Sequence, residues 1–243
     1  MRLILLSLLV GPIAASLLPS PQTIFTNPLS EEGWSIPTIH ESAVQARRIL
    51  RLETIGTLST IFPSSSSIAP FERRPSDVQG TPVGLMDYFA DCEAHGNPTI
   101  LAIGIATSFK NVDAGSNITL SLRWHPPYPA GTPYSAASMP RFSLVGYLED
   151  IEKDEMNKLG VEGCFVKTHP DAAAWLPGNR IHESKFVRLV VKEVYWIGGF
   201  GDRAYIGWIP LDEWSQVTEK EIGETRLPGE KNKWKWANFV GDW

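Results

Sequence analysis

The chain has 243 residues, a formal net charge of −5 at pH 7 and a hydrophobic fraction of 43%. These values predict one globular domain with an ordinary core, and the acidic balance disfavours a nucleic-acid or anionic-membrane partner. No internal apolar stretch approaches the ~20 residues that a helix needs to cross a bilayer, so no membrane span is expected.

Residues 1–16 have the pattern of a secretory signal peptide. Arg2 supplies the positive start, residues 3–10 form a short apolar core, and Ala14-Ala15-Ser16 offers small residues for cleavage. The alternative is a buried N-terminal helix. We expect export, with the protein secreted or held in the lumen of a vacuole-like compartment. Residues 17–36, rich in proline and serine, predict an exposed lead-in.

A helix is expected over Ile39–Leu52. Thr38 is placed to cap it, and Glu41 to complete a capping box. The arginines of this helix mostly avoid its apolar face, and a solvated surface is the favoured interpretation over an anion site. They are Arg47, Arg48 and Arg51.

Seven segments rich in β-branched, leucine and aromatic residues predict strands. They are residues 54–62, 82–89, 99–106, 118–124, 142–151, 186–197 and 204–209. The connections between the first four are too short for helical crossovers, so the strands are expected to be antiparallel. The pattern predicts a β-rich α+β domain over residues 37–217, a small antiparallel barrel of six to seven strands decorated by several helices.

Helices are expected in the second half of the chain. Residues 152–168 have a helical composition weakened by Gly160 and Gly163, and Pro210 is placed to start a last helix. Residues 107–116 and 171–175 predict short helical turns. Residues 218–243 form a tail rich in Trp and Lys, which either packs back on the barrel or offers a binding patch.

Export gives meaning to two further features. Cys92 and Cys164 are the only cysteines, so an oxidising compartment allows one disulfide; two separate thiols are the alternative. Asn117-Ile118-Thr119 is an N-glycosylation sequon in a predicted turn before a strand. A glycosylated, extracellular protein is therefore expected.

No constellation of residues indicates catalysis or a metal site. The five histidines lack ligand spacing, and the sequence has no nucleophile elbow, P-loop or dinucleotide fingerprint. Gly198-Gly199-Phe200-Gly201 lies between two predicted strands. A tight turn is the favoured interpretation, and a close approach of backbone to a ligand is the alternative.

Four segments, in this order and spacing, resemble one family. They are residues 55–60 (Ile-Gly-Thr-Leu-Ser-Thr), 107–112 (Thr-Ser-Phe-Lys-Asn-Val), 169–172 (His-Pro-Asp-Ala, followed by Trp175) and the glycine-rich 198–201. Together they are similar to the FMN-binding split barrels related to pyridoxamine 5'-phosphate oxidase, and within them to CREG-type glycoproteins and HugZ-type haem-utilisation proteins. The resemblance implies an antiparallel split β-barrel, usually a homodimer with the flavin site at the subunit interface.

The resemblance also implies where FMN would bind, and this chain departs from it there. Family enzymes hold the phosphate with basic residues from the second strand and from the segment after the third. Here residues 82–89 contain no Arg or Lys and carry Asp87. The phosphate-side positions are then Thr107 and Ser108, with Lys110 close behind. Dianions need charge-assisted donors, so no cofactor is expected; FMN is the first alternative and haem, through His169, the second.

These observations predict a secreted CREG-like split-barrel glycoprotein without catalysis, acting by recognition of a protein or ligand. The alternative is an FMN- or haem-dependent oxidoreductase of the same fold.

Overall fold

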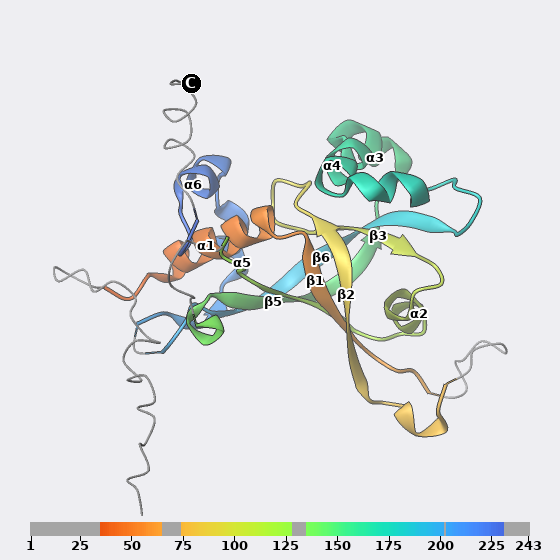
Figure 1. Cartoon of the computed structure of the whole chain (residues 1–243), viewed down its shortest axis with the longest axis horizontal. Coiled ribbons are helices and arrows are strands. Elements are labelled where there is room, and N and C mark those ends of the chain that lie inside the picture. Colours follow the sequence, from red (N-terminus) through yellow and green to blue (C-terminus); the bar gives the residue numbers. More distant parts are fainter. Residues whose placement is uncertain (1–34, 65–73, 128–134, 202, 231–243) are drawn as a thin grey trace, which may run out of the picture.

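The computed structural model describes residues 35–64, 74–127, 135–201 and 203–230. The predicted signal peptide and most of the predicted lead-in lie outside these residues, as does the end of the predicted tail. All seven predicted strands are present and antiparallel, in the order β3-β2-β1-β4-β5-β6-β7 (Figure 1). Their bounds are β1 Ile55–Ile61, β2 Pro82–Ala90, β3 Thr99–Ile103, β4 Ile118–Arg123, β5 Arg141–Asp150, β6 Ser184–Ile197 and β7 Ile206–Ile209.

Strands β1 to β6 close into a barrel because β3 also pairs with β6. The long strand β6 makes this possible: its first part pairs with β3, its last part pairs with β7, and β5 pairs with it from Val187 to Ile197. β7 is thus an extra strand beside a six-stranded barrel. The structure confirms the predicted β-rich α+β barrel with surrounding helices.

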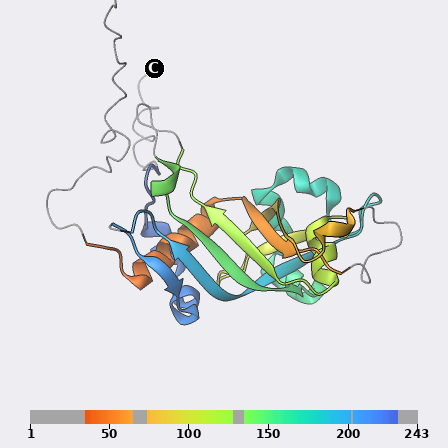
Figure 2. The ribbon, with the colours of Figure 1, turned by 90° about the horizontal axis from the view of Figure 1, so that it is seen from below.

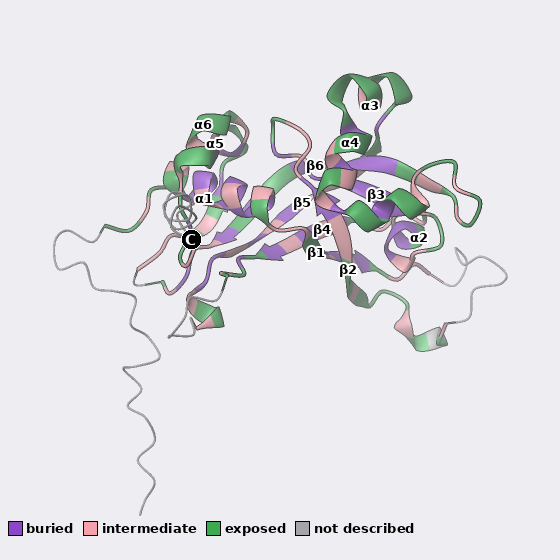
Figure 3. Cartoon of the chain, turned by 45° about the horizontal axis from the view of Figure 1, so that its top comes forward, coloured by how far each residue is buried: buried purple, intermediate pink, exposed green. Residues whose placement is uncertain are grey.

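The barrel interior follows from the period-two alternation of its strands. In β4, Ile118, Leu120 and Leu122 are buried while the residues between them face outward. Phe142, Leu144 and Trp196 of the next strands join them, as the buried stripes in Figure 3 show. Each such side chain contributes about 1.5–3 kcal/mol when it leaves water.

Helix α1 (Ile39–Leu52) begins with the predicted capping box between Thr38 and Glu41. Its apolar face, including Ala46 and Ile49, packs into the barrel core. The remaining helical elements are α2 Thr107–Asp113, α3 Lys153–Leu159, α4 Val161–Thr168, α5 Leu211–Gln216, α6 Glu219–Glu224, and the short turns η3 Ser76–Val78, η4 Ala136–Ser138 and η5 Pro170–Trp175. Within the described residues, no helix has the length and apolar character to cross a membrane.

The arginines of α1 correct the prediction of a solvated face. Arg47 is fully buried and donates to the carbonyl oxygens of Trp214 (3.3 Å) and Ala94 (2.9 Å). The other two pair with carboxylates: Arg48 with Glu230, and Arg51 with Asp91 (2.7 Å) and Glu219 (2.8 Å). Sequence periodicity marks the arginines as polar, but long side chains reach across the helix to partners that only the fold supplies.

A second apolar cluster lies outside the barrel, under α4 and η5. It includes Val161 and Phe165 of α4, packed over Leu101 and Phe186 of β3 and β6. A disulfide between Cys92 and Cys164, with Cα atoms 5.9 Å apart, joins α4 to the loop after β2. Helices α4 and η5 therefore cover this part of the barrel's outer face. The strands β1, β4, β5 and β6 run side by side, as Figure 2 shows.

Three local expectations need correction. Strand β3 ends at Ile103 rather than near residue 106, because Gly104 leads into a turn before α2. The predicted 152–168 helix is two helices, since Gly160 takes a left-handed conformation with φ +64° between them. The predicted tail begins with helix α6, whose capping box joins Thr218 and Glu221.

Candidate functional site

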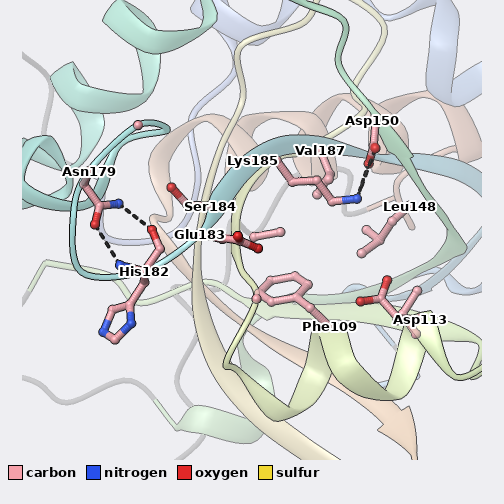
Figure 4. Close-up of a pocket in the computed structure, with 14 residues that line it drawn as sticks. Phe109, Asp113, Leu148, Asp150, Asn179, His182, Glu183, Ser184, Lys185 and Val187 are labelled. Carbon is pink, nitrogen blue, oxygen red and sulfur yellow. Dashed lines mark hydrogen bonds and ion pairs between the residues drawn. The ribbon is translucent and has the colours of Figure 1, made fainter. Parts of the chain in front are cut away.

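The candidate site is a cavity of about 630 Å³ beside α2, named the α2 cavity below. Its apolar floor comes from Phe109 and Val112 of α2 and from Leu148 and Val187 of β5 and β6. Its rim is the loop that leads into β6, residues 178–184. In Figure 4, Phe109 of α2, Leu148 of β5 and Glu183 of the rim loop lie around the same space.

Asn179 organises the rim loop. Its side-chain amide donates to the carbonyl oxygens of Leu176 (3.0 Å) and His182 (2.9 Å), and its Oδ1 accepts the backbone N–H groups of Ile181 (2.8 Å) and His182 (2.9 Å). Ser184 donates its hydroxyl to the carbonyl of Trp175 at 2.8 Å. Hydrogen bonds from side chains to the backbone therefore fix the conformation of this loop, in place of the backbone hydrogen bonds of a β-sheet. A loop fixed in this way can form a rigid wall of a binding pocket.

The charge of the α2 cavity is negative. Asp113, Asp150 and Glu183 line it together with one cation, Lys185. The Lys185 ammonium lies 2.7 Å from Asp150, so its charge is already matched (Figure 4). Two carboxylates, on Asp113 and Glu183, make no ion pair in the part of the chain that the structure describes. Such a lining repels a phosphate dianion and favours neutral or cationic groups.

The structure places the three predicted phosphate-side residues at the start of α2, outside the cavity lining. Thr107 is half-buried, Ser108 is buried, and Lys110 is exposed. They share one helix but do not converge: Ser108 faces the protein interior while Lys110 faces solvent. This arrangement does not supply the set of charged donors that holds a phosphate in a pocket.

Asp87 lies on β2 opposite Gly56 and shares the inward face of its strand with Phe89. Burial raises the pKa of its carboxyl, while the backbone N–H of Tyr88, donating at 2.8 Å, opposes that shift. A half-buried acid therefore occupies the strand from which family enzymes present basic residues.

His169 packs within the protein rather than opening onto a site. Its ring is buried, stacks on Tyr88 with centroids 4.2 Å apart, and contacts Phe165. Its Nε2 lies 2.8 Å from the carbonyl oxygen of Phe89, to which it donates. That bond occupies Nε2, and the ring is only 5% exposed, so His169 is placed as a packed residue and not as a haem ligand facing an open site.

Two other predicted features have clear places. Asn117 is exposed directly before β4. At the glycine-rich turn, Gly198 donates its N–H to the Tyr205 carbonyl at 3.0 Å, closing the β6–β7 hairpin. A Cβ on Gly198 would lie 2.8 Å from Nε1 of Trp196, so close packing requires glycine there.

A family model described as "CREG, beta-barrel" matches residues 37–216. The chain belongs to the CREG β-barrel family. The resemblance inferred from the four sequence segments is thereby confirmed. A search of curated proteins finds no match.

The CREG barrel of this chain is similar to solved structures at low sequence identity. A heme-binding protein from Mycobacterium smegmatis matches with TM-score 0.53 and 16% identity, over 74% of this chain and 61% of that chain. Campylobacter jejuni ChuZ matches with TM-score 0.46 and 14% identity, over 69% and 59% of the two chains. A pyridoxamine 5'-phosphate oxidase-like protein from Listeria innocua matches with TM-score 0.40 and 9% identity, over 65% and 98%. At these identities the likeness concerns the fold, and this chain spans about three-fifths of the mycobacterial protein.

Sequence reasoning missed the residues that form the α2 cavity. Asp113, Asp150 and Lys185 are ordinary surface residues in the sequence, and only the fold brings them together. One signal was present: Gly178-Asn179 just before a predicted strand marks a turn whose side chain bonds to the backbone. Within the described residues, no three His, Cys, Asp or Glu side chains are grouped to hold a metal ion.

Proposed function

We propose that this CREG-family protein is an exported glycoprotein that works by binding a protein or a small ligand, without redox catalysis. The observation that carries the proposal is the charge of the α2 cavity. Its single cation, Lys185, is neutralised by Asp150, while Asp113 and Glu183 add negative charge. A lining of this kind suits recognition of a neutral or cationic group and opposes a bound FMN phosphate.

The positions where the family would supply basic residues support the same proposal. Strand β2 presents Asp87, and the start of α2 presents a buried hydroxyl at Ser108. Lys110, two residues further along α2, extends into solvent. A solvent-exposed lysine contributes little to holding a dianion, because water screens it and its side chain must be ordered on binding.

Export is supported by the exposed sequon and the disulfide geometry. Asn117 is exposed, and Cys92 and Cys164 are joined, as an oxidising compartment permits. A disulfide that joins α4 to the loop after β2 stabilises the fold by constraining the unfolded chain.

The test of export and glycosylation is expression of the full chain in a secreting eukaryotic host. We expect the protein in the medium, carrying a glycan that an endoglycosidase removes. Thr119→Val should abolish this mass step, and Thr119→Ser should keep it because serine preserves the sequon. Retention of the wild-type protein in the cytosol without a glycan would contradict the proposal.

The expectation that the protein binds no flavin is tested on the same purified protein. FMN and riboflavin are each added at one equivalent, and the protein is passed through a desalting column. We expect neither flavin to be retained. Retention of FMN but not riboflavin would show a phosphate site and would favour the oxidoreductase alternative.

A further inference from the structure

A second hollow lies on the outer face of the barrel, away from the α2 cavity. It measures about 470 Å³ and is lined by residues of β1, β4, β5 and β6, named the outer hollow below. Its floor is a row of small side chains that face each other across the strands: Thr57, Ser121 and Ser143. Because these residues are short, the surface dips between the longer side chains around them. Figure 2 shows the strands that form it.

Two arginines stand over this floor. Arg123 of β4 and Arg141 of β5 are direct cross-strand partners on the outward face. Side chains in such pairs start about 5 Å apart, and like charges placed there destabilise a sheet. A negatively charged group placed between Arg123 and Arg141 would remove this repulsion.

The structure gives these arginines neutral partners only. Arg123 donates its Nε to Nε2 of His125 at 2.6 Å, and Arg141 donates to the carbonyl oxygen of Ala137 at 3.2 Å. Within the described ranges, neither guanidinium forms an ion pair. The carboxylate of Glu53 lies beyond the His125 ring and is engaged by that residue's Nδ1 and backbone N–H. Both positive charges therefore lack a counter-charge among the residues that the structure describes.

The rest of the hollow supplies a hydrogen-bond donor and an apolar wall. The hydroxyls of Ser121 and Ser143 lie 2.8 Å apart, and their mutual bond uses only one of their two protons. The other proton is available to an acceptor. On the far side, Tyr195 and Ile197 of β6 line the hollow, and Tyr195 packs against Trp208 with ring centroids 5.0 Å apart.

We propose that the outer hollow binds a small organic carboxylate with a flat apolar body. The planar guanidinium groups match a carboxylate in geometry and charge. The free serine proton donates to the same group, and the body of the ligand lies against Tyr195 and Ile197. A volume near 470 Å³ falls in the range of small-molecule sites. This site is separate from the α2 cavity and does not depend on its role.

Benzoate is the probe, with benzyl alcohol as its neutral counterpart and acetate as a carboxylate without the apolar body. Thermal unfolding of the full exported chain is followed as each is titrated at constant ionic strength. We expect a saturable rise in melting temperature with benzoate, a weaker one with acetate and none with benzyl alcohol. Equal effects of benzoate and benzyl alcohol, or no effect of benzoate, would overturn the proposal.

Arg123→Gln and Arg141→Gln test the residues. Each should weaken benzoate binding by about tenfold or more, because a hydrogen bond to a charged group contributes about 1.5–3 kcal/mol. Lys192→Gln, which removes the same charge from an exposed site on β6, should leave it unchanged. Without ligand, the arginine variants should melt no lower than the wild type, since each relieves the repulsion. Unchanged benzoate binding in both variants would contradict the proposal. So would variants that keep their affinity for benzoate but change from dimer to monomer in solution.

Discussion

Arg47 shows how a single residue connects three parts of the molecule. Its guanidinium is fully buried, lies 5.4 Å from the ring centroid of Trp214, and bonds to backbone carbonyls of α5 and of the loop after β2. Burial lowers the pKa of Arg47, and the nearby Asp91 carboxylate opposes that shift. Arg47 keeps its positive charge because the fold holds the two carbonyl oxygens and the Asp91 carboxylate close to its guanidinium.

Replacing this residue should be costly. Arg47→Ala leaves two buried carbonyl groups without donors and removes one of the two arginines whose charge acts on Asp91. We expect a loss of about 3 kcal/mol in the free energy of unfolding, measured by urea denaturation. Gln45→Ala, one helical face away, should change it by less than about 0.5 kcal/mol. Similar small effects of both substitutions would contradict the role assigned to Arg47.

His40 links the start of α1 to the C-terminal helices. Its ring lies 2.9 Å from Glu221 and 2.8 Å from Glu213. The hydrogen bonds to Glu221 and then Glu213 raise the pKa of His40 above its usual 6.5. The same contact, helped by Thr218, lowers the pKa of Glu221 to about 2.

The pH dependence follows from the sign of the His40 shift. The stabilisation is fully present below pH 6.5, the value in the unfolded chain, and disappears as the pH rises through the higher folded pKa. The stability difference between wild type and His40→Asn, measured by denaturation across this range, should therefore shrink as the pH increases. A wild-type advantage that grows toward alkaline pH would rule out this explanation.

At the scale of elements, Gly146 determines how β5 and β6 fit together. The register of this pair shifts between Val145 and Gly146. A Cβ on Gly146 would lie 2.0 Å from the carbonyl oxygen of Val190, so no other residue fits without moving the backbone. The irregularity helps one long strand serve both the barrel and β7.

Two glycine substitutions should therefore act in opposite directions. Gly146→Ala should lower the free energy of unfolding by about 2–3 kcal/mol through backbone displacement. Gly163→Ala, inside α4 with open space around it, should raise it by about 0.5–1 kcal/mol through helix propensity. Calorimetry on both proteins measures the contrast, and a stable Gly146→Ala variant would show that the strands can adjust.

The sequence predicts these elements where the signal is local. The alternation of Ile118, Leu120 and Leu122 and the capping box of α1 are written in adjacent residues, and both are confirmed. The same capping pattern at Thr218 was missed because it lay in a segment read as a tail. The burial of Arg47 could not be predicted, since its partners are 47 and 167 residues away.

The candidate site is harder to predict than the fold for the same reason. The α2 cavity draws on α2, the end of β5 and the loop before β6, and its charge appears only when Asp113 and Asp150 meet. The departures at β2 and at residues 107–110 could be predicted from the sequence, because they are differences from a family pattern. The place where Asp113, Asp150 and Glu183 come together could not be predicted from the sequence.

At the scale of the whole molecule, the barrel has two distinct exteriors. One end is covered by α3 and α4, as Figures 1 and 3 show, together with η5. The Cys92–Cys164 disulfide joins α4 to the loop after β2 at this end. The open face of β1, β4 and β5 carries two neighbouring arginines, Arg123 and Arg141. The α2 cavity carries carboxylates that form no ion pair among the described residues, on Asp113 and Glu183. A molecule with two hollows of opposite charge is suited to recognition of different groups at different places.

The absorbance spectrum of the protein as purified from a secreting host tests the central claim most directly. A barrel whose family phosphate positions are occupied by Asp87, Thr107 and Ser108 should emerge without flavin or haem bands. Flavin absorbance at one equivalent per chain, or a haem band of similar stoichiometry, would contradict the account.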